Sequence, residues 1–159
     1  MANQTAEIAQ LTMETQIDAP PERVWQALTE NIGGWWPVEF FAGGEEGKRN
    51  YICEAHPGGR MFEQWDDGGG LLWGTVICAE PNVRLQVLGV TFPNWGGPSL
   101  GYVSWDLSAN DNGTTLTFSE SMLGRISEAN IDEKNKGWAF LCNSMKAYVE
   151  GDPPPAWQG

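Results

Sequence analysis

The chain has few of the residues on which metal sites and disulfide scaffolds depend. Its single histidine, His56, and its three cysteines provide no cluster of nitrogen and sulfur ligands of the kind that a zinc or iron site needs. Cys53, Cys78 and Cys142 are far apart and form no C-x-x-C pair, so we expect reduced core thiols. His56 lies in the turn-forming stretch HPGG without an evident orienting partner for base catalysis. We therefore expect no metal and no other cofactor.

Positive charge is also scarce. Nine Lys and Arg residues against 21 Asp and Glu give a formal net charge of −12, which repels phosphate backbones and anionic membrane surfaces. The chain has no run of about 18 apolar residues, and its start has no basic segment followed by an apolar one. We expect no nucleic-acid partner, no membrane insertion and a cytoplasmic location.

Turn-forming residues and aromatic residues are abundant instead. The clusters HPGG, DDGGG, EPNV, PNWGGP and NDNGTT separate short β-rich runs. The runs are NYICEA, GRMFEQWD, LLWGTVICAE, RLQVLGVTF, GYVSWDLS and TTLTFSESML. Together with a strand expected from Ile8 to Ile17, they predict an antiparallel meander of seven strands.

Helical patterns follow the first expected strand and the last one. DAPPERVWQALTE combines helix-starting prolines with one apolar face, and a second short helix is expected before Pro37. Near the C-terminus, IDEKNKGWAFLCNSMKAYVEG places Trp138, Leu141 and Met145 at three- and four-residue steps. This predicts an amphipathic helix about 30 Å long that ends at Gly151.

The order of these segments resembles a known superfamily. IDAPPERVWQALT, WW, PGGRMFEQWDDGG, WGTVICAEPNVRL, DNGTTLTFSES and KGWAFLCNSMKAYVEG are similar to segments of the SRPBCC (START-like) superfamily. More narrowly, they resemble its subfamily named after the activator of the heat-shock chaperone ATPase. The resemblance runs from about Leu11 to Gly151.

The resemblance implies an α+β helix-grip fold. In that fold a seven-stranded curved antiparallel sheet wraps around a long C-terminal helix, two short helices follow the first strand, and an apolar cavity lies between sheet and helix. We expect a single helix-grip domain over residues 1–151 and a proline-rich C-terminal tail over 152–159.

One face of the predicted sheet is apolar. Val103, Trp105 and Leu107 alternate with polar residues, and Leu116 and Phe118 do the same in the next strand. These side chains and the apolar face of the long helix must bury each other. They either fill an ordinary core or, as the resemblance implies, line a partial cavity.

Glu120 continues the inward alternation of the last strand, which brings a carboxylate onto this apolar face. If it is dry and unpaired, its pKa should rise, and it would serve as an acid or a base near neutral pH. Alternatively, it sits at the cavity mouth or pairs with Arg60 or Arg125, and only holds structure.

The stretch ENIGGWWPVEFF holds four large rings. Neighbours on a helix point about 100° apart, so Trp35 and Trp36 must face different surroundings. We expect at least one of them, with Phe40 or Phe41 nearby, to border the cavity and the other to pack against the first helix. Trp95, in FPNWGGP, is either a lid over the cavity mouth or a surface aromatic residue.

The leading functional prediction is that the protein binds a small hydrophobic molecule, aromatic or planar, in a cavity between sheet and C-terminal helix. A second hypothesis is a polyketide cyclase- or dehydratase-like lyase with Glu120 as the catalytic acid or base, helped by Tyr51 or Arg60. A third, the least favoured for a single domain, is a module that interacts with a chaperone. The expected ligand-binding residues are Trp35, Trp36, Phe40, Phe41, Tyr51, Phe62, Trp73, Trp105, Phe118, Glu120, Trp138, Leu141 and Met145.

Overall fold

The structure is a computed structural model that describes residues 5–158, apart from the side chain of Asn94. It contains one antiparallel sheet, three α-helices and two 3-10 helices, η1 and η2. Along the chain the elements are β1 (Glu7–Ile17), α1 (Pro21–Thr29), α2 (Ile32–Trp35), η1 (Val38–Phe40), β2 (Arg49–Cys53), β3 (Arg60–Trp65), β4 (Gly70–Glu80), β5 (Arg84–Thr91), η2 (Pro93–Trp95), β6 (Ser99–Asn110), β7 (Gly113–Gly124) and α3 (Glu128–Glu150).

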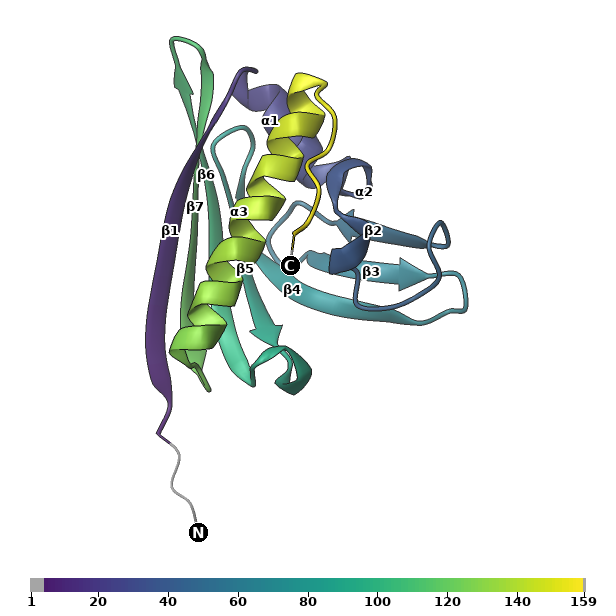
Figure 1. Cartoon of the computed structure of the whole chain (residues 1–159). Helices are drawn as coiled ribbons and strands as arrows, with labels where there is room; N and C mark the ends of the chain where they lie inside the picture. Colours follow the sequence, from purple (N-terminus) through teal and green to yellow (C-terminus); the bar gives the residue numbers. More distant parts are fainter. Residues whose placement is uncertain (1–4, 159) are drawn as a thin grey trace.

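The seven strands lie in the order β1-β7-β6-β5-β4-β3-β2, so the first two strands of the chain form the two edges of the sheet. Figure 1 shows the sheet curving strongly, with β2 and β3 running across the direction of β1 and β7, and with α3 along its concave side. Register shifts at Met61/Phe62 and at Val76/Cys78 interrupt the β3–β4 and β4–β5 pairings, as bulges that bend a sheet do. This arrangement confirms the predicted helix-grip fold.

The apolar stripe predicted in the last two strands forms the floor of the core. Leu107 lies opposite Leu116, and Trp105 lies opposite Phe118 across the β6–β7 ladder. Leu116 and Phe118 have no exposed surface, and burial of one such side chain stabilises a fold by about 1.5–3 kcal/mol. From the other side, α3 contributes buried apolar residues that include Met145.

The long helix begins earlier than its apolar pattern suggests. Ser127 is the N-cap residue, and its side chain accepts a hydrogen bond from the backbone N–H of Asn130. Glu128 in the first turn adds a favourable charge at the helix N-terminus. At the other end Gly151 adopts the left-handed conformation, with φ of 80°, that closes the helix as predicted.

The proline-rich tail is packed against the domain. Figure 1 shows it running back along α3 toward η1. The ring of Trp157 contacts Phe40 of η1 at 5.1 Å and Phe140 of α3 at 4.9 Å between ring centroids. The tail therefore joins η1 to the outward side of α3.

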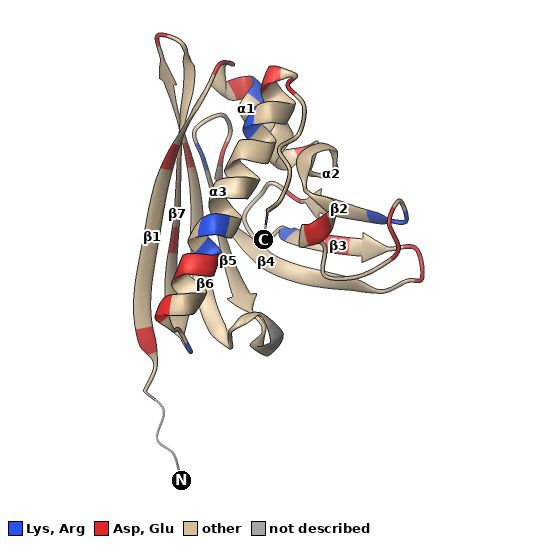
Figure 2. Cartoon of the chain, viewed as in Figure 1, with Lys and Arg blue, Asp and Glu red and all other residues tan. Residues whose placement is uncertain are grey.

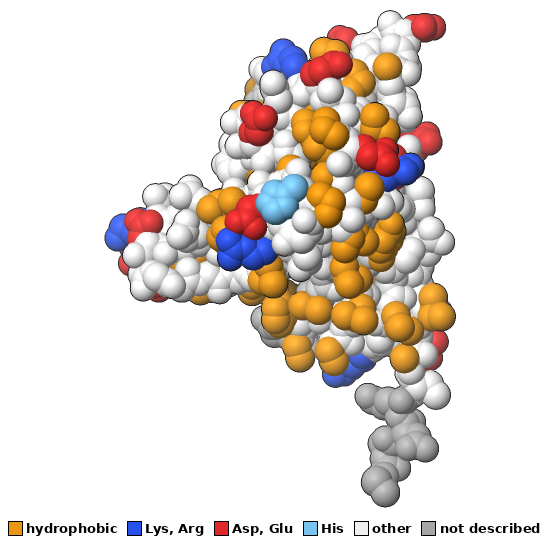
Figure 3. Space-filling model, turned by 180° about the vertical axis from the view of Figure 1, so that it is seen from behind, with side chains coloured by type: hydrophobic (Ala, Val, Ile, Leu, Met, Phe, Trp, Pro, Cys, Tyr) orange, Lys and Arg blue, Asp and Glu red, His pale blue; other side chains and the backbone are white. Residues whose placement is uncertain are grey.

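The outer face of the sheet carries a row of exposed apolar side chains across four strands. Ile8 lies opposite Leu123, Leu123 opposite Leu100, and Leu100 opposite Val90. Figure 3 shows apolar side chains gathered on this side of the molecule. Among the described residues, no helix has the length and apolar composition needed to cross a membrane.

Candidate functional site

A row of aromatic rings runs from α2 to η2 across strands β2 and β4. Trp95 of η2 stacks on Trp73 of β4, with 5.3 Å between ring centroids and 15° between ring planes. Trp73 in turn lies parallel to Tyr51 of β2 at 6.4 Å, and Trp36 packs on Tyr51 at 4.5 Å. We call Trp36, Tyr51, Trp73 and Trp95 the aromatic row.

The members of the aromatic row differ in exposure. Trp36 and Tyr51 are buried, whereas Trp95 is 40% exposed and closes the outer end of the row. Burial, followed by the nearby Cys53 and Glu63, raises the pKa of Tyr51 well above its usual value. Tyr51 therefore remains a neutral phenol at physiological pH and is unsuited to act as a base.

A buried carboxylate holds Trp73 in place. Glu63 of β3 is 1% exposed, and its side chain accepts hydrogen bonds from the indole nitrogens of Trp73 and Trp65, at 3.0 and 2.9 Å. Both oxygens also accept from the backbone N–H of Ala42, at 2.8 and 3.1 Å. Since the two indole bonds fix ring orientation, Glu63 sets the plane on which Trp95 stacks.

Glu63 is not among the site residues predicted from the sequence. The available signal was its spacing in GRMFEQWD. Met61, Glu63 and Trp65 are two residues apart and so share one face of the strand, which indicates an inward carboxylate. The bulge between β3 and β4 obscured the facing of Trp73, and without Trp73 the role of Glu63 was not visible.

Glu120 faces the interior, as the alternation predicts, and it is 3% exposed. One carboxylate oxygen lies 2.8 Å from Nζ of Lys134, and the other accepts a 2.7 Å hydrogen bond from the indole nitrogen of Trp138. On β6, Gly101 leaves room for the carboxylate, because a Cβ there would lie 2.7 Å from Oε1 of Glu120.

The predicted pairing of Glu120 with Arg60 or Arg125 is wrong. Arg60 forms an ion pair with Glu54 at 2.6 Å, and the α3 residue Lys134 reaches Glu120 instead. The physical reason is that α3 lies directly over β7, so the partner comes from the helix and not from a strand or loop. Because Lys134 and Trp138 each bind one carboxylate oxygen, Glu120 has the contacts of a structural ion-pair residue and not those of a free acid or base.

The space between sheet and α3 is largely filled by rings. Trp138 contacts Phe118 at 4.2 Å and Trp105 at 5.9 Å between ring centroids. Near η2 and the start of α3 the rings leave a pocket of about 10 Å³, which is room for roughly one water molecule. Its lining includes Thr91, Trp95, Met122, Arg125, Asn130 and Lys134, and we call it the mouth pocket.

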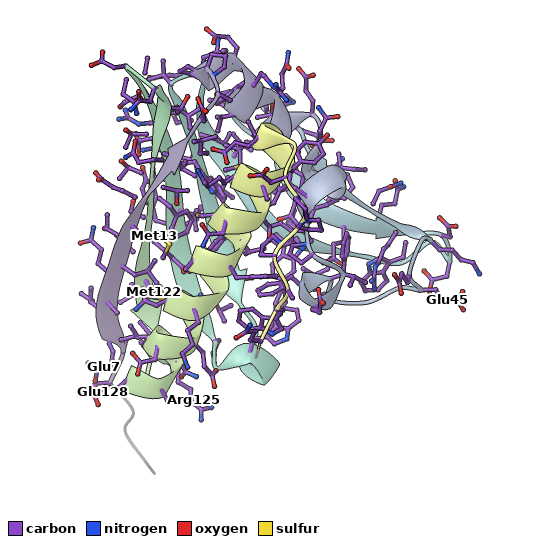
Figure 4. All side chains as sticks on the ribbon, turned by 45° about the horizontal axis from the view of Figure 1, so that its top comes forward. Glu7, Met13, Glu45, Met122, Arg125 and Glu128 are labelled. Carbon is purple, nitrogen blue, oxygen red and sulfur yellow. The ribbon has the colours of Figure 1, made fainter. Side chains whose placement is uncertain are left out.

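In this conformation the mouth pocket itself is too small for a ligand. Figure 4 shows Met122 between the sheet and α3, and Arg125 at the end of the molecule where α3 begins. A molecule larger than water enters the mouth pocket only if a lining side chain moves. The exposed Trp95 is the lining residue that belongs to the short helix η2.

The two adjacent tryptophans contact each other, with 5.6 Å between ring centroids, but their other neighbours differ as expected. The indole of Trp35 donates a 2.8 Å hydrogen bond to the backbone oxygen of Ala27, so Trp35 packs against α1. Trp36 belongs to the aromatic row. Its indole nitrogen is buried and has no hydrogen-bond partner among the described residues.

Three predicted site residues lie away from this group. Phe40 stacks on Phe140, with 5.5 Å between ring centroids, and meets Trp157 of the tail edge-on. Phe41 lies under the guanidinium of Arg49 at 4.5 Å, and Phe62 lies under that of Arg60 at 4.6 Å. Phe62 alternates with the buried Met61 and Glu63 and so faces away from the aromatic row. Leu141 and Met145 are buried further along α3.

Other candidate chemistry is weak in the described part of the chain. Residues 5–158 contain no group of three or more His, Cys, Asp or Glu side chains that could hold a metal ion. His56 is exposed, and its ring nitrogen lies 3.2 Å from the backbone oxygen of Pro57. A groove of about 270 Å³ between β1 and α3 is open, and Met13, Gln16 and Lys146 contribute to its lining. It lacks aromatic side chains.

Fold and site together define a helix-grip domain with an aromatic interior between sheet and C-terminal helix. Residues 18–150 match the family described as activator of Hsp90 ATPase homolog 1-like protein, and the chain belongs to this family. No curated protein matches the sequence.

Solved structures share the fold at low sequence identity. An uncharacterised protein from Rhizobium leguminosarum is 23% identical with a TM-score of 0.69, over 93% of this chain and 98% of its own. DynU16, a protein in the dynemicin biosynthetic locus, is 22% identical with a TM-score of 0.68, over 92% of this chain and 49% of its own. CalU16 from Micromonospora echinospora is 23% identical with a TM-score of 0.61, over 94% of this chain and 78% of its own.

Proposed function

We propose that this protein binds a small, planar, hydrophobic molecule between the sheet and α3, in the position that the Trp95 ring now occupies. The observation that carries the proposal is the parallel stacking of the exposed Trp95 on Trp73, 5.3 Å apart. A flat ligand that replaces Trp95 gains the same kind of stacking surface, and Tyr51 and Trp36 continue that surface inward.

The energy needed to displace Trp95 is modest. Stacking of one aromatic pair contributes about 0.5–1.5 kcal/mol beyond the area it buries. A micromolar complex has a binding free energy of about 8 kcal/mol, so loss of the Trp95 contact leaves ample room for measurable affinity. η2 is three residues long, and the backbone N–H groups of Trp95 and Gly97 both donate to the backbone oxygen of Phe92 in the same loop, so these bonds do not tie Trp95 to the sheet.

Glu63 supports a role for Trp73 as a binding surface. Side chains in a packed core also have defined orientations, but a hydrogen bond at the edge of an indole anchors the ring while leaving its face for stacking. The hydrogen bond from Trp73 to Glu63 supplies that orientation from a residue that is itself fully buried.

The test is calorimetric titration with a panel of flat aromatic compounds of one to three rings and, for comparison, straight-chain fatty acids. We expect flat compounds to bind and Trp73→Ala to weaken binding about tenfold or more, since stacking against Trp73 is lost. Trp95→Ala should bind as tightly as the wild type or tighter, because no ring has to leave. Trp157→Phe is the matched control, since Trp157 lies on the tail and outside the row.

Two outcomes contradict the proposal. One is the absence of binding by every compound to the wild type and to Trp95→Ala. The other is an equal loss of affinity in Trp73→Ala and Trp157→Phe, which would place the ligand elsewhere.

A further inference from the structure

The mouth pocket has a charge opposite to that of the whole protein. The chain carries a formal net charge of −12, and Figure 2 shows acidic residues spread over helices, strands and loops. Among the described residues that line the mouth pocket there are two cations, Arg125 and Lys134, and no carboxylate. An acidic protein thus presents positive charge at the proposed point of entry.

The two cations are not equivalent. Lys134 is neutralised by the buried Glu120, 2.8 Å away. Arg125 directly follows β7, and its backbone N–H donates a 2.9 Å hydrogen bond to the backbone oxygen of Pro98, in the loop before β6. The base of the Arg125 side chain is therefore held next to the loop that carries Trp95.

The guanidinium of Arg125 has no acidic partner within residues 5–158. Arg60 and Arg84 each lie within ion-pair distance of a carboxylate, whereas no carboxylate oxygen comes that close to Arg125. Figure 4 shows Glu128 and Glu7 on the other side of the start of α3. Arg125 lines the mouth pocket together with Trp95 of the aromatic row, so its guanidinium is available to bind a ligand there.

From this geometry we infer that the ligand is an aromatic acid: a flat ring system that stacks on Trp73 and carries a carboxylate that Arg125 binds at the mouth. The inference rests on the proposed function and adds the chemical class and orientation of the ligand. A guanidinium binds a carboxylate through two parallel hydrogen bonds, which a neutral amide cannot match. Asn130 and Thr91 supply neutral polar groups in the same lining.

The experiment compares matched pairs of probes that share one ring system and differ only in charge. Each pair consists of an aromatic carboxylate and its carboxamide, with one, two and three fused rings, titrated at pH 7 by calorimetry. We expect the carboxylate of the best pair to bind about tenfold more tightly than its amide, the effect of one charge-assisted contact at a solvated mouth. Because the mouth is solvated, this preference should shrink at high salt.

Two substitutions assign the preference to a residue. Arg125→Gln keeps a polar side chain and should reduce the preference to twofold or less, while amide affinity stays unchanged. Arg23→Gln is the matched control, since Arg23 is an exposed arginine on α1, away from the mouth pocket. Circular dichroism checks that both variants fold.

The outcomes distinguish a failure of the aromatic-acid inference from a failure of the proposed function, which is the binding of flat hydrophobic molecules. If carboxylates and amides bind equally well to the wild type, or if Arg125→Gln and Arg23→Gln act alike, the protein binds flat molecules but the anionic class is wrong. If no probe of either charge binds to the wild type or to Trp95→Ala, the proposed function fails and the aromatic acid fails with it.

Discussion

Replacement of Glu63 by glutamine should destabilise the protein more than its small chemical change suggests. The side chain is 1% exposed and each of its oxygens accepts from one indole nitrogen, with the N–H of Ala42 shared between them. An amide has only one oxygen. Whichever way the amide points, its NH2 group faces the indole N–H of Trp65 or Trp73, so a donor meets a donor.

The magnitude follows from the groups left unpaired. One buried indole N–H loses its acceptor, which costs about 1–3 kcal/mol, and the new NH2 group lacks acceptors at similar cost. Removal of a buried negative charge offsets part of this, because that charge has no cation beside it among the described residues. The several N–H donors already compensate the carboxylate, so we expect a net loss of about 2–4 kcal/mol.

Urea unfolding followed by circular dichroism measures this loss. Glu54→Gln is the matched control, since Glu54 pairs with Arg60 at the surface and should lose less stability. Near-ultraviolet circular dichroism should also change in Glu63→Gln, because Trp73 loses its fixed orientation. A Glu63→Gln variant as stable as Glu54→Gln, with an unchanged aromatic spectrum, would refute the account of Glu63.

Four further expectations concern the core, the buried ion pair, the helix end and the thiols. Phe118→Ala should lower the free energy of unfolding by about 3–5 kcal/mol in urea titrations, since Phe118 has no exposed surface. Glu120→Gln should cost about 3 kcal/mol, near the lower end for a broken buried pair, because the side chain of Lys134 is 22% exposed. Gly151→Ala should cost about 1 kcal/mol in thermal unfolding, because φ is 80° there. Burial raises the pKa of Cys142 from 9.0 to about 12, so its thiol should resist alkylation at pH 8 until the protein unfolds.

The raised thiol pKa also sets a direction for stability against pH. The folded protein keeps the Cys142 proton to higher pH than the unfolded chain, so the contribution is complete below about pH 9 and is lost as pH rises toward 12. Cys53 adds to the same trend, because burial also raises its pKa to about 12. Stability that stays constant between pH 9 and 12 in urea titrations would contradict this.

The Glu120 result also bears on the lyase hypothesis. If Glu120→Gln leaves stability unchanged but abolishes a pH-dependent turnover of an aromatic substrate, the carboxylate is catalytic and the structural interpretation is wrong. If stability falls and ligand affinity in the calorimetric panel persists, Glu120 is a structural partner of Lys134. Gly101→Ala offers a related check, because its methyl group would press on the same carboxylate.

The period of two in the last strands was enough to place Leu116, Phe118 and Glu120 on the inner face, because β6 and β7 pair without interruption. The same local logic predicted the amphipathic α3, its end at Gly151 and the different neighbours of Trp35 and Trp36. These features depend on residues close together in the chain, which is why the sequence alone determined them.

Three other features depend on how segments that are distant in the sequence pack together, so only the tertiary structure decided them. Bulges shift the register around β4, so the orientation of Trp73 and its bond to Glu63 could not be counted from either end of a strand. The choice of Lys134 as partner for Glu120 depends on the rotation of α3 over β7. The volume of the mouth pocket, about 10 Å³, depends on how Trp95 of η2 and the side chains of β7 and α3 pack together, which the local sequence pattern does not show.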